Sequence, residues 1–184
     1  MSGGCAFFAD LLESGAAPQV PRPAPAEAST IGYTSGTTGH PKGAVQSHRA
    51  VFLNTAALFA VQTRTERDVM LNALPLPHVY GNIVMNGTFM AGATLVMMER
   101  FDAATALAEI ARHRVTVFDG VPTMYAMMLA DPSLPGADLS TLRICAVGGQ
   151  TMPAVLRRQL AVGAVDPRRA DLALELSEIP GQAA

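Results

Sequence analysis

A stretch rich in glycine and hydroxyl residues, at positions 31–43, contains the residue types best suited to chemistry. It reads Ile-Gly-Tyr-Thr-Ser-Gly-Thr-Thr-Gly-His-Pro-Lys-Gly, with four glycines, four Ser/Thr hydroxyls and one lysine. Glycines leave backbone N–H groups open to a ligand, and consecutive N–H groups form a nest for an anion. The hydroxyls add donors, and the ammonium adds a mobile positive charge. Such a loop suits a polyphosphate, and ATP is the best candidate.

Other phosphate motifs do not fit this stretch. A Walker A loop has Lys directly after its last glycine, whereas Lys42 precedes Gly43. The G-x-G-x-x-G spacing of a dinucleotide-binding turn is also missing here. An ordinary Ser/Thr/Gly-rich linker is the remaining alternative. The apolar residues Ile31 and Tyr33 before the loop and Pro41 after it argue against a linker.

Residues 33–43 resemble the AMP-binding signature of the adenylate-forming superfamily, which includes acyl-CoA synthetases, luciferases and peptide-synthetase adenylation domains. The resemblance implies ATP and Mg²⁺, with coenzyme A as a co-substrate. It also implies a catalytic role for Lys42 and a magnesium contact for Thr34. The ATP-binding residues that it implies in this loop are Thr34, Ser35, Gly36, Thr37, Thr38, Gly39 and Lys42.

Residues 74–81, Leu-Pro-Leu-Pro-His-Val-Tyr-Gly, are similar to a second signature of the family, a proline-rich turn at the acyl pocket. By this resemblance His78 is catalytic and contacts the carboxylate and the acyl-adenylate. Tyr80 and Gly81, with Val121 from the similar segment 118–125, would line the acyl site. A lone histidine is often purely structural, but its place in a loop after a strand favours function. Core packing explains three methionines at helical spacing better than a pocket does: Met124, Met127 and Met128.

Residues 143–153 resemble the family's glycine turn beneath the adenine ring. Gly148 and Gly149 would leave room for the base, and Gln150 would flank it. A glycine pair is weak evidence alone, but it follows the other two segments in the family's order.

The apolar pattern predicts alternating strands and helices. Strands are expected at 29–33, 43–46, 68–74, 93–98, 115–118 and 142–147, the one at 93–98 being buried. Helices are expected at 6–14, from Ser47 to about 61, at 83–90, after Asp102, at 123–129 and after Thr151. The helix at 83–90 is expected to be buried. Ser47, Asp102 and Thr151 are the expected N-caps. The apolar face of the helix after Ser47 is predicted to hold Ala50, Leu53, Asn54, Ala57, Leu58 and Val61. This alternation predicts an α/β fold with a largely parallel sheet and helices on both faces.

Composition narrows the possible classes of protein. Net charge is −2 over 184 residues, so no basic surface suggests nucleic acid. Cys5 and Cys145 lie too far apart in sequence for a metal motif or a disulfide framework. We expect a cytoplasmic chain, because the sequence contains no signal peptide and no apolar run long enough to span a membrane.

The resemblance covers about residues 7–160. We expect an N-terminal helix and Pro/Ala-rich connector at 1–28, a partial AMP-binding domain at 29–162, and an unrelated tail at 163–184. The family's aromatic-Gly-x-Thr-Glu signature does not occur in these 184 residues. The resemblance therefore predicts part of an ATP-dependent acyl-CoA synthetase for a fatty or aryl acid, inactive by itself. The alternative is a non-catalytic nucleotide-binding or interaction module.

Overall fold

The computed structural model describes residues 22–34 and 40–154. The elements in this part of the chain are β1 (Ala28–Thr34), β2 (Lys42–Ser47), α2 (His48–Val61), β3 (Val69–Asn72), α3 (Val79–Ala91), β4 (Thr94–Met97), α4 (Ala103–His113), β5 (Val117–Gly120), α5 (Pro122–Ala130), the 3-10 helix η1 (Leu134–Gly136) and β6 (Ile144–Val147). The helices expected at 6–14 and after Thr151, and the tail from 163, lie outside the described residues. No helix in the described ranges is long and apolar enough to cross a bilayer.

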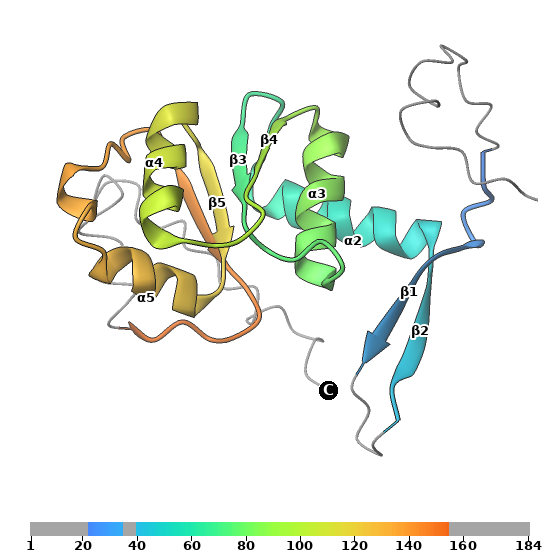
Figure 1. The fold of residues 1–184 in the computed structure, drawn as a ribbon. Coiled ribbons are helices and arrows are strands. Elements are labelled where there is room, and N and C mark those ends of the chain that lie inside the picture. Colours follow the sequence, from blue (N-terminus) through green and yellow to red (C-terminus); the bar gives the residue numbers. More distant parts are fainter. Residues whose placement is uncertain (1–21, 35–39, 155–184) are drawn as a thin grey trace, which may run out of the picture.

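Four parallel strands form the central sheet, in the order β4-β3-β5-β6 (Figure 1). Each pairing is parallel and in continuous register, for example Leu71 with Phe118 and Phe118 with Cys145. A helix follows each of β3, β4 and β5, which returns the chain to the amino end of the next strand. The predicted parallel α/β fold is therefore confirmed.

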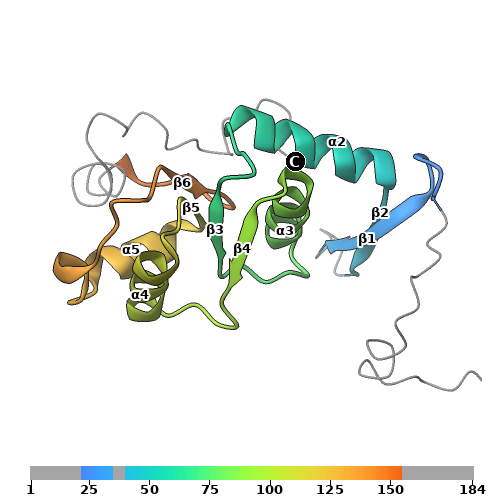
Figure 2. The same ribbon diagram turned by 90° about the horizontal axis from the view of Figure 1, so that it is seen from above.

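Helices cover both faces of this sheet, with α2 and α3 on one side and α4 and α5 on the other (Figure 2). Side chains alternate between the two layers along each strand. In β3, Met70 faces α2 and α3, whereas Leu71 faces α4 and α5. In β5, Val117 and Phe118 divide in the same way. Burial on both faces explains why these strands are continuously apolar in sequence.

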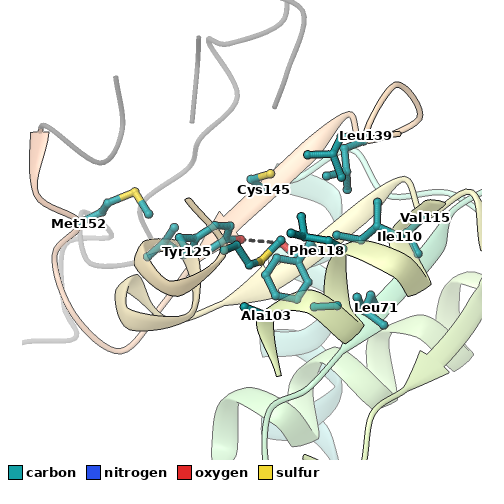
Figure 3. Close-up of a cluster of buried hydrophobic side chains, with 14 residues drawn as sticks. Leu71, Ala103, Ile110, Val115, Phe118, Tyr125, Leu139, Cys145 and Met152 are labelled. Carbon is teal, nitrogen blue, oxygen red and sulfur yellow. Dashed lines mark hydrogen bonds between the residues drawn. The ribbon is translucent and has the colours of Figure 1, made fainter. Parts of the chain in front are cut away.

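The layer beneath α4 and α5 contains the larger hydrophobic cluster (Figure 3). The rings of Phe118 and Tyr125 meet edge to face, with centroids 5.3 Å apart. The buried Tyr125 hydroxyl lies 2.8 Å from the carbonyl oxygens of both Phe118 and Ala146. These hydrogen bonds satisfy the only polar atom of the side chain and connect α5 to β5 and β6.

Strands β1 and β2 form a separate antiparallel hairpin beside α2 and α3 (Figures 1 and 2). The register pairs Thr34 with Lys42 at the loop end of the hairpin, so the loop at 35–41 connects directly opposed residues. Ser47 ends the hairpin and caps α2, accepting a hydrogen bond from the Ala50 N–H at 3.2 Å. Both predicted strands and the predicted N-cap are confirmed.

Two packing predictions are wrong. Of the face predicted for α2, only Leu58 is buried. The other buried residues of this helix are Thr55 and Phe59, and Phe59 belongs to the hydrophobic cluster shared with α3 and the sheet. The strand predicted as buried at 93–98 is β4, which is only partly covered because it lies at the edge of the described sheet. Helical spacing alone could not choose between two apolar faces of α2.

A polar cluster joins the amino ends of the strands. Asp68 accepts hydrogen bonds from Arg143 Nε at 2.8 Å, from the Thr116 hydroxyl at 2.6 Å and from the Thr65 N–H at 2.8 Å. Burial alone would raise the pKa of Asp68, but the hydrogen bonds and the Arg143 charge outweigh it and lower the pKa to about 2. The cluster therefore stabilises the fold only while Asp68 is ionised.

Replacing Asp68 with Asn should lower the free energy of unfolding at pH 7 by about 1–3 kcal/mol, because Arg143 loses its charged partner. The native chain should lose stability as the pH falls from about 5 to 2, since the carboxylate holds its proton less tightly when folded than when unfolded. Asp68→Asn should lack this part of the acid dependence. Urea unfolding followed by circular dichroism between pH 2 and 7 measures both effects.

The matched control is Glu66→Gln, which removes an exposed carboxylate lying 3.9 Å from Arg67. It should change the unfolding free energy by less than about 0.5 kcal/mol. An acid dependence of equal slope in Asp68→Asn and the native chain would contradict the assignment.

Candidate functional site at the carboxyl edge of the sheet

The loops that follow β3, β5 and β6 converge at one edge of the sheet. Parallel strands end on the same side, and the three strands are neighbours. The Gly148 N–H donates to the Gly120 carbonyl at 3.1 Å, which joins the loops after β5 and β6. This edge therefore brings together residues that lie up to about 75 positions apart in sequence.

Tyr80 lies at the centre of this edge. Its ring packs against Gly148, where a Cβ atom would lie only 2.6 Å from Cε1 of the tyrosine. Its hydroxyl lies 3.2 Å from Asp119 Oδ1 and 3.4 Å from the Ala146 carbonyl oxygen. Burial, together with the Asp119 charge, raises the pKa of Tyr80 well above 10, so the phenol stays protonated and donates. The bare backbone of Gly148 thus gives space to the tyrosine ring.

Asp119 also forms a fully buried ion pair with Arg64, which follows α2. The two guanidinium nitrogens lie 2.9 and 2.7 Å from the two carboxylate oxygens, and neither side chain has any exposed surface. The guanidinium carbon lies 4.7 Å from the ring centroid of Phe59. The bidentate geometry and the aromatic contact offset the cost of removing both charges from water.

Sequence reasoning missed this pair. Arg64 lies in the polar run Thr-Arg-Thr-Glu-Arg-Asp, which looks like an exposed turn. Asp119 offered the better signal, because a carboxylate at the end of a buried apolar strand requires a partner.

Asp119→Ala should lower the free energy of unfolding by about 3–5 kcal/mol, because Arg64 would remain buried without a counter-charge. The double variant Arg64→Met/Asp119→Leu removes both charges and should cost clearly less than the single variant. Chemical unfolding of each protein measures the difference. Arg67→Met, which alters an exposed arginine, should be nearly neutral. A double variant as unstable as Asp119→Ala would contradict the importance of charge pairing.

His78 is the N-cap of α3. Its Nδ1 accepts a hydrogen bond from the Tyr80 N–H at 3.2 Å, and the side chain is exposed. In this arrangement the neutral ring carries its proton on Nε2. The observed capping gives His78 a structural task, and its contact with a substrate remains a prediction.

Gly81 lies in the first turn of α3, and Val121 is the N-cap of α5 at the same edge. A Cβ on Gly81 would lie 2.4 Å from the Pro75 carbonyl oxygen, so the proline turn packs directly on the helix backbone. A Cβ on Gly149, whose φ is 83°, would lie 3.6 Å from Val121 Cγ1. Val121 is partly buried, and Gly149 and Gln150 are exposed. The structure therefore groups the residues expected at the acyl and adenine sites, without testing their roles.

The predicted core methionines divide between two environments. Met128 is buried and Met124 packs against both hydrophobic clusters, whereas Met127 is exposed. The core prediction is correct for Met124 and Met128 and wrong for Met127, which lies on the outer face of α5.

The phosphate-loop candidates lie at the end of the hairpin. Thr34 and Lys42 are exposed and paired across β1 and β2, so their side chains share one face of the hairpin. Lys42 makes no ion pair in the described part of the chain, and it is the only lysine of the sequence. Ser35, Gly36, Thr37, Thr38 and Gly39 lie outside the described residues. The hydroxyl and the ammonium fit a polyphosphate ligand.

A parallel sheet covered on both faces defines an α/β domain, and domains of this architecture bind ligands at the carboxyl edge of the sheet. The profile of the family described as AMP-binding enzyme matches residues 4–166. The chain belongs to this AMP-binding enzyme family.

Curated relatives include CoA ligases. Indoleacetate–CoA ligase of Aromatoleum aromaticum is 38% identical over 160 residues, which cover 86% of this chain and 31% of the relative. Long-chain-fatty-acid–CoA ligase of Bacillus subtilis is 32% identical over 134 residues, which cover 71% of this chain and 24% of the relative. The chain thus spans about a quarter to a third of the length of these relatives.

Solved structures agree with this membership. The inhibitor-bound N-terminal domain of FACL13 from Mycobacterium tuberculosis matches with a TM-score of 0.74 at 32% identity, over 85% of this chain and 40% of that one. ATP-bound MatB from Rhodopseudomonas palustris matches with a TM-score of 0.72 at 31% identity, over 83% of this chain and 31% of that one.

Gly148→Ala should lower the free energy of unfolding by about 1–3 kcal/mol, because the new methyl group would overlap the Tyr80 ring. Gly136→Ala is the control, since a Cβ there meets no atom within 4 Å. Thermal or urea unfolding measures both variants. In a double-mutant cycle with Tyr80→Leu, most of the cost of Gly148→Ala should disappear. Additive effects would show that the two residues are not coupled.

Proposed function

We propose that this chain provides the nucleotide- and acid-binding region of an ATP-dependent acid–CoA ligase. The observation that carries the proposal is the pairing of Thr34 with Lys42 at the mouth of a complete glycine- and hydroxyl-rich loop, in a member of the AMP-binding enzyme family. Similarity to ATP-bound MatB supports ATP as the nucleotide. A malonyl-CoA ligase with methylmalonyl-CoA and AMP bound is similar at 30% identity, which supports coenzyme A as the acceptor.

The proposed reaction has two steps. A carboxylate oxygen of the acid attacks the α-phosphorus of ATP, forming an acyl-adenylate as pyrophosphate leaves. The sulfur of coenzyme A then attacks the acyl carbon and releases AMP. Charge accumulates on phosphate oxygens in the first step, and groups that are already oriented toward it lower the barrier.

Each part of the chain has a proposed task in this reaction. Lys42 and the loop hydroxyls hold the β- and γ-phosphates. When bound with the nucleotide, Mg²⁺ supplies Lewis-acid neutralisation of phosphate charge. Thr34 would contribute one oxygen to that ion. The described residues contain no cluster of three or more His, Cys, Asp or Glu side chains that could hold a metal ion.

The acid is proposed to bind at the carboxyl edge of the sheet. His78 would meet the carboxylate, with Tyr80, Gly81 and Val121 beside the acyl group. Because the Tyr80 hydroxyl already bonds to Asp119, this residue would contribute its ring and not a free hydroxyl. Gly148, Gly149 and Gln150 would border the adenine. Relatives named for indoleacetate, coumarate and long-chain fatty acids support an aryl or fatty acid as the substrate.

We propose further that these 184 residues bind substrates without turning them over. The aromatic-Gly-x-Thr-Glu signature does not occur in this sequence, so the carboxylate expected beside Mg²⁺ is not supplied by it. Loss of one oriented electrostatic group commonly costs a factor of about 10² to 10³ in rate. The alternative function is a nucleotide-binding module that catalyses no reaction, and it also predicts binding without turnover. The two functions predict different results only when the remaining parts of the reaction are supplied.

Calorimetric titration with ATP and Mg²⁺ should detect weak binding, and Lys42→Ala should weaken it by about tenfold or more, because a charge-assisted phosphate contact is lost. The control is Arg67→Ala, which removes a different exposed cation. Because Lys42 is the only lysine, a lysine-reactive ATP analogue should label this position, and excess ATP should prevent the labelling. Equal affinity in the native and Lys42→Ala proteins would contradict the phosphate role.

Turnover is tested separately with ATP, Mg²⁺, coenzyme A and a panel of fatty and aryl acids. We expect no acyl-CoA above background from the 184-residue chain. Pyrophosphate release that depends on Lys42 would show instead that the chain is catalytic alone.

A further inference from the structure

Helices α2 and α3 are apolar on two faces, and only one face of each is buried in the described core. On α2, Leu58 and Phe59 are buried, whereas Phe52 and Leu53 are 57% and 53% exposed. On α3, Phe89 and Met90 are exposed in the same way. An amphipathic surface helix normally turns polar residues outward, so a helix that is apolar on both faces is usually covered on both.

The exposed faces line one groove. It has a volume of about 690 Å³ and lies between α2, α3 and the segment that leads into β1. Its walls include Pro23, Pro25, Phe52, Leu53, Phe89 and Met90. Arg49 and His48 also line it, and neither makes an ion pair within the described residues. The groove thus combines an apolar floor with the guanidinium of Arg49 and the imidazole of His48.

The N-terminal segment has the matching properties. Residues 6–14 carry Phe7, Leu11 and Leu12 at the spacing of one helix face, with the carboxylates of Asp10 and Glu13 among them. Residues 1–21 contain these two acidic side chains and no Lys or Arg, a side-chain charge of −2. Residues 155–184 instead contain four Arg and four Asp or Glu residues, so their net side-chain charge is zero. Charge therefore favours the N-terminal segment as the occupant.

The position of attachment favours the same segment. Pro23 and Pro25 line the groove, so the chain before Arg22 starts at its rim. The twelve residues from Leu12 to Pro23 span at most about 40 Å when extended, which is enough to cross the groove. A tethered segment also binds at an effective concentration in the millimolar range, which favours it over a free partner.

We propose that residues 6–14 dock into the groove between α2 and α3, with Phe7, Leu11 and Leu12 on its apolar floor and the Asp10 and Glu13 carboxylates near Arg49 and His48. The docked segment covers the second apolar face of both helices. This surface is separate from the proposed ATP and acid sites.

Cys5 provides a natural probe, because it lies directly before the docking segment. Phe89→Cys places a second thiol in the groove, and Met127→Cys places one at a similar exposure on α5. Both substitutions are made in a Cys145→Ala background, which removes the other native thiol. Under mild oxidation, an intramolecular disulfide from Cys5 to position 89 should form about tenfold faster than one to position 127, because docking raises the local thiol concentration. Peptide mapping without reduction identifies each bond.

Charge reversal provides the second readout. Asp10→Arg/Glu13→Arg should slow the cross-link to position 89 several-fold, and adding Arg49→Glu should restore much of the rate. Equal rates at positions 89 and 127 would overturn the proposal. A disulfide that forms mainly between two molecules, and faster at higher protein concentration, would assign the groove to a second copy and would overturn it too. Insensitivity to charge reversal would exclude the proposed orientation.

Discussion

The buried ion pair of Arg64 and Asp119 is the interaction on which the arrangement of the site depends. It joins the segment after α2 to the end of β5, and the Tyr80 hydroxyl extends it to the start of α3. Burying two charges away from water costs free energy, and only the close geometry of the pair offsets this cost. The positions of Arg64 and Asp119 therefore tolerate little movement. Because the Tyr80 ring then fills the space above Gly148, the loops after β3, β5 and β6 are held in one arrangement. The network acts at the edge where the proposed acid and adenine sites meet.

The opposite end of the sheet has its own polar connection, through Asp68, Thr116 and Arg143. The two connections differ in exposure. Arg143 remains partly exposed, whereas Arg64 and Asp119 are fully buried. A partly solvated pair is easier to alter without disturbing packing, and a buried pair must be replaced as a unit. The sheet thus has a more adaptable amino end and a more rigid carboxyl end, where the proposed ligands bind.

Sequence alone predicted the succession of strands and helices, because continuous apolar strands and N-caps such as Ser47 and Asp102 are local signals. It also placed His78, Tyr80 and Gly148 in loops that the parallel sheet brings to one edge. It could not pair Arg64 with Asp119, since a contact across 55 positions leaves no periodic trace. It chose the wrong face of α2 for a related reason. Where both faces are apolar, the neighbouring elements decide which one is buried.

The buried hydroxyls of Tyr80 and Tyr125 and the buried thiol of Cys145 give this fold an alkaline limit. Burial raises the pKa of both tyrosines well above 10, and it raises the pKa of Cys145 from 9.0 to about 12. In the unfolded chain all three groups release their protons at lower pH, so the unfolded state binds fewer protons in alkali. Stability must therefore fall as the pH rises above about 9. Up to three protons would leave in one cooperative step, so alkaline unfolding should be steep in pH, with tyrosinate absorbance appearing as the structure is lost.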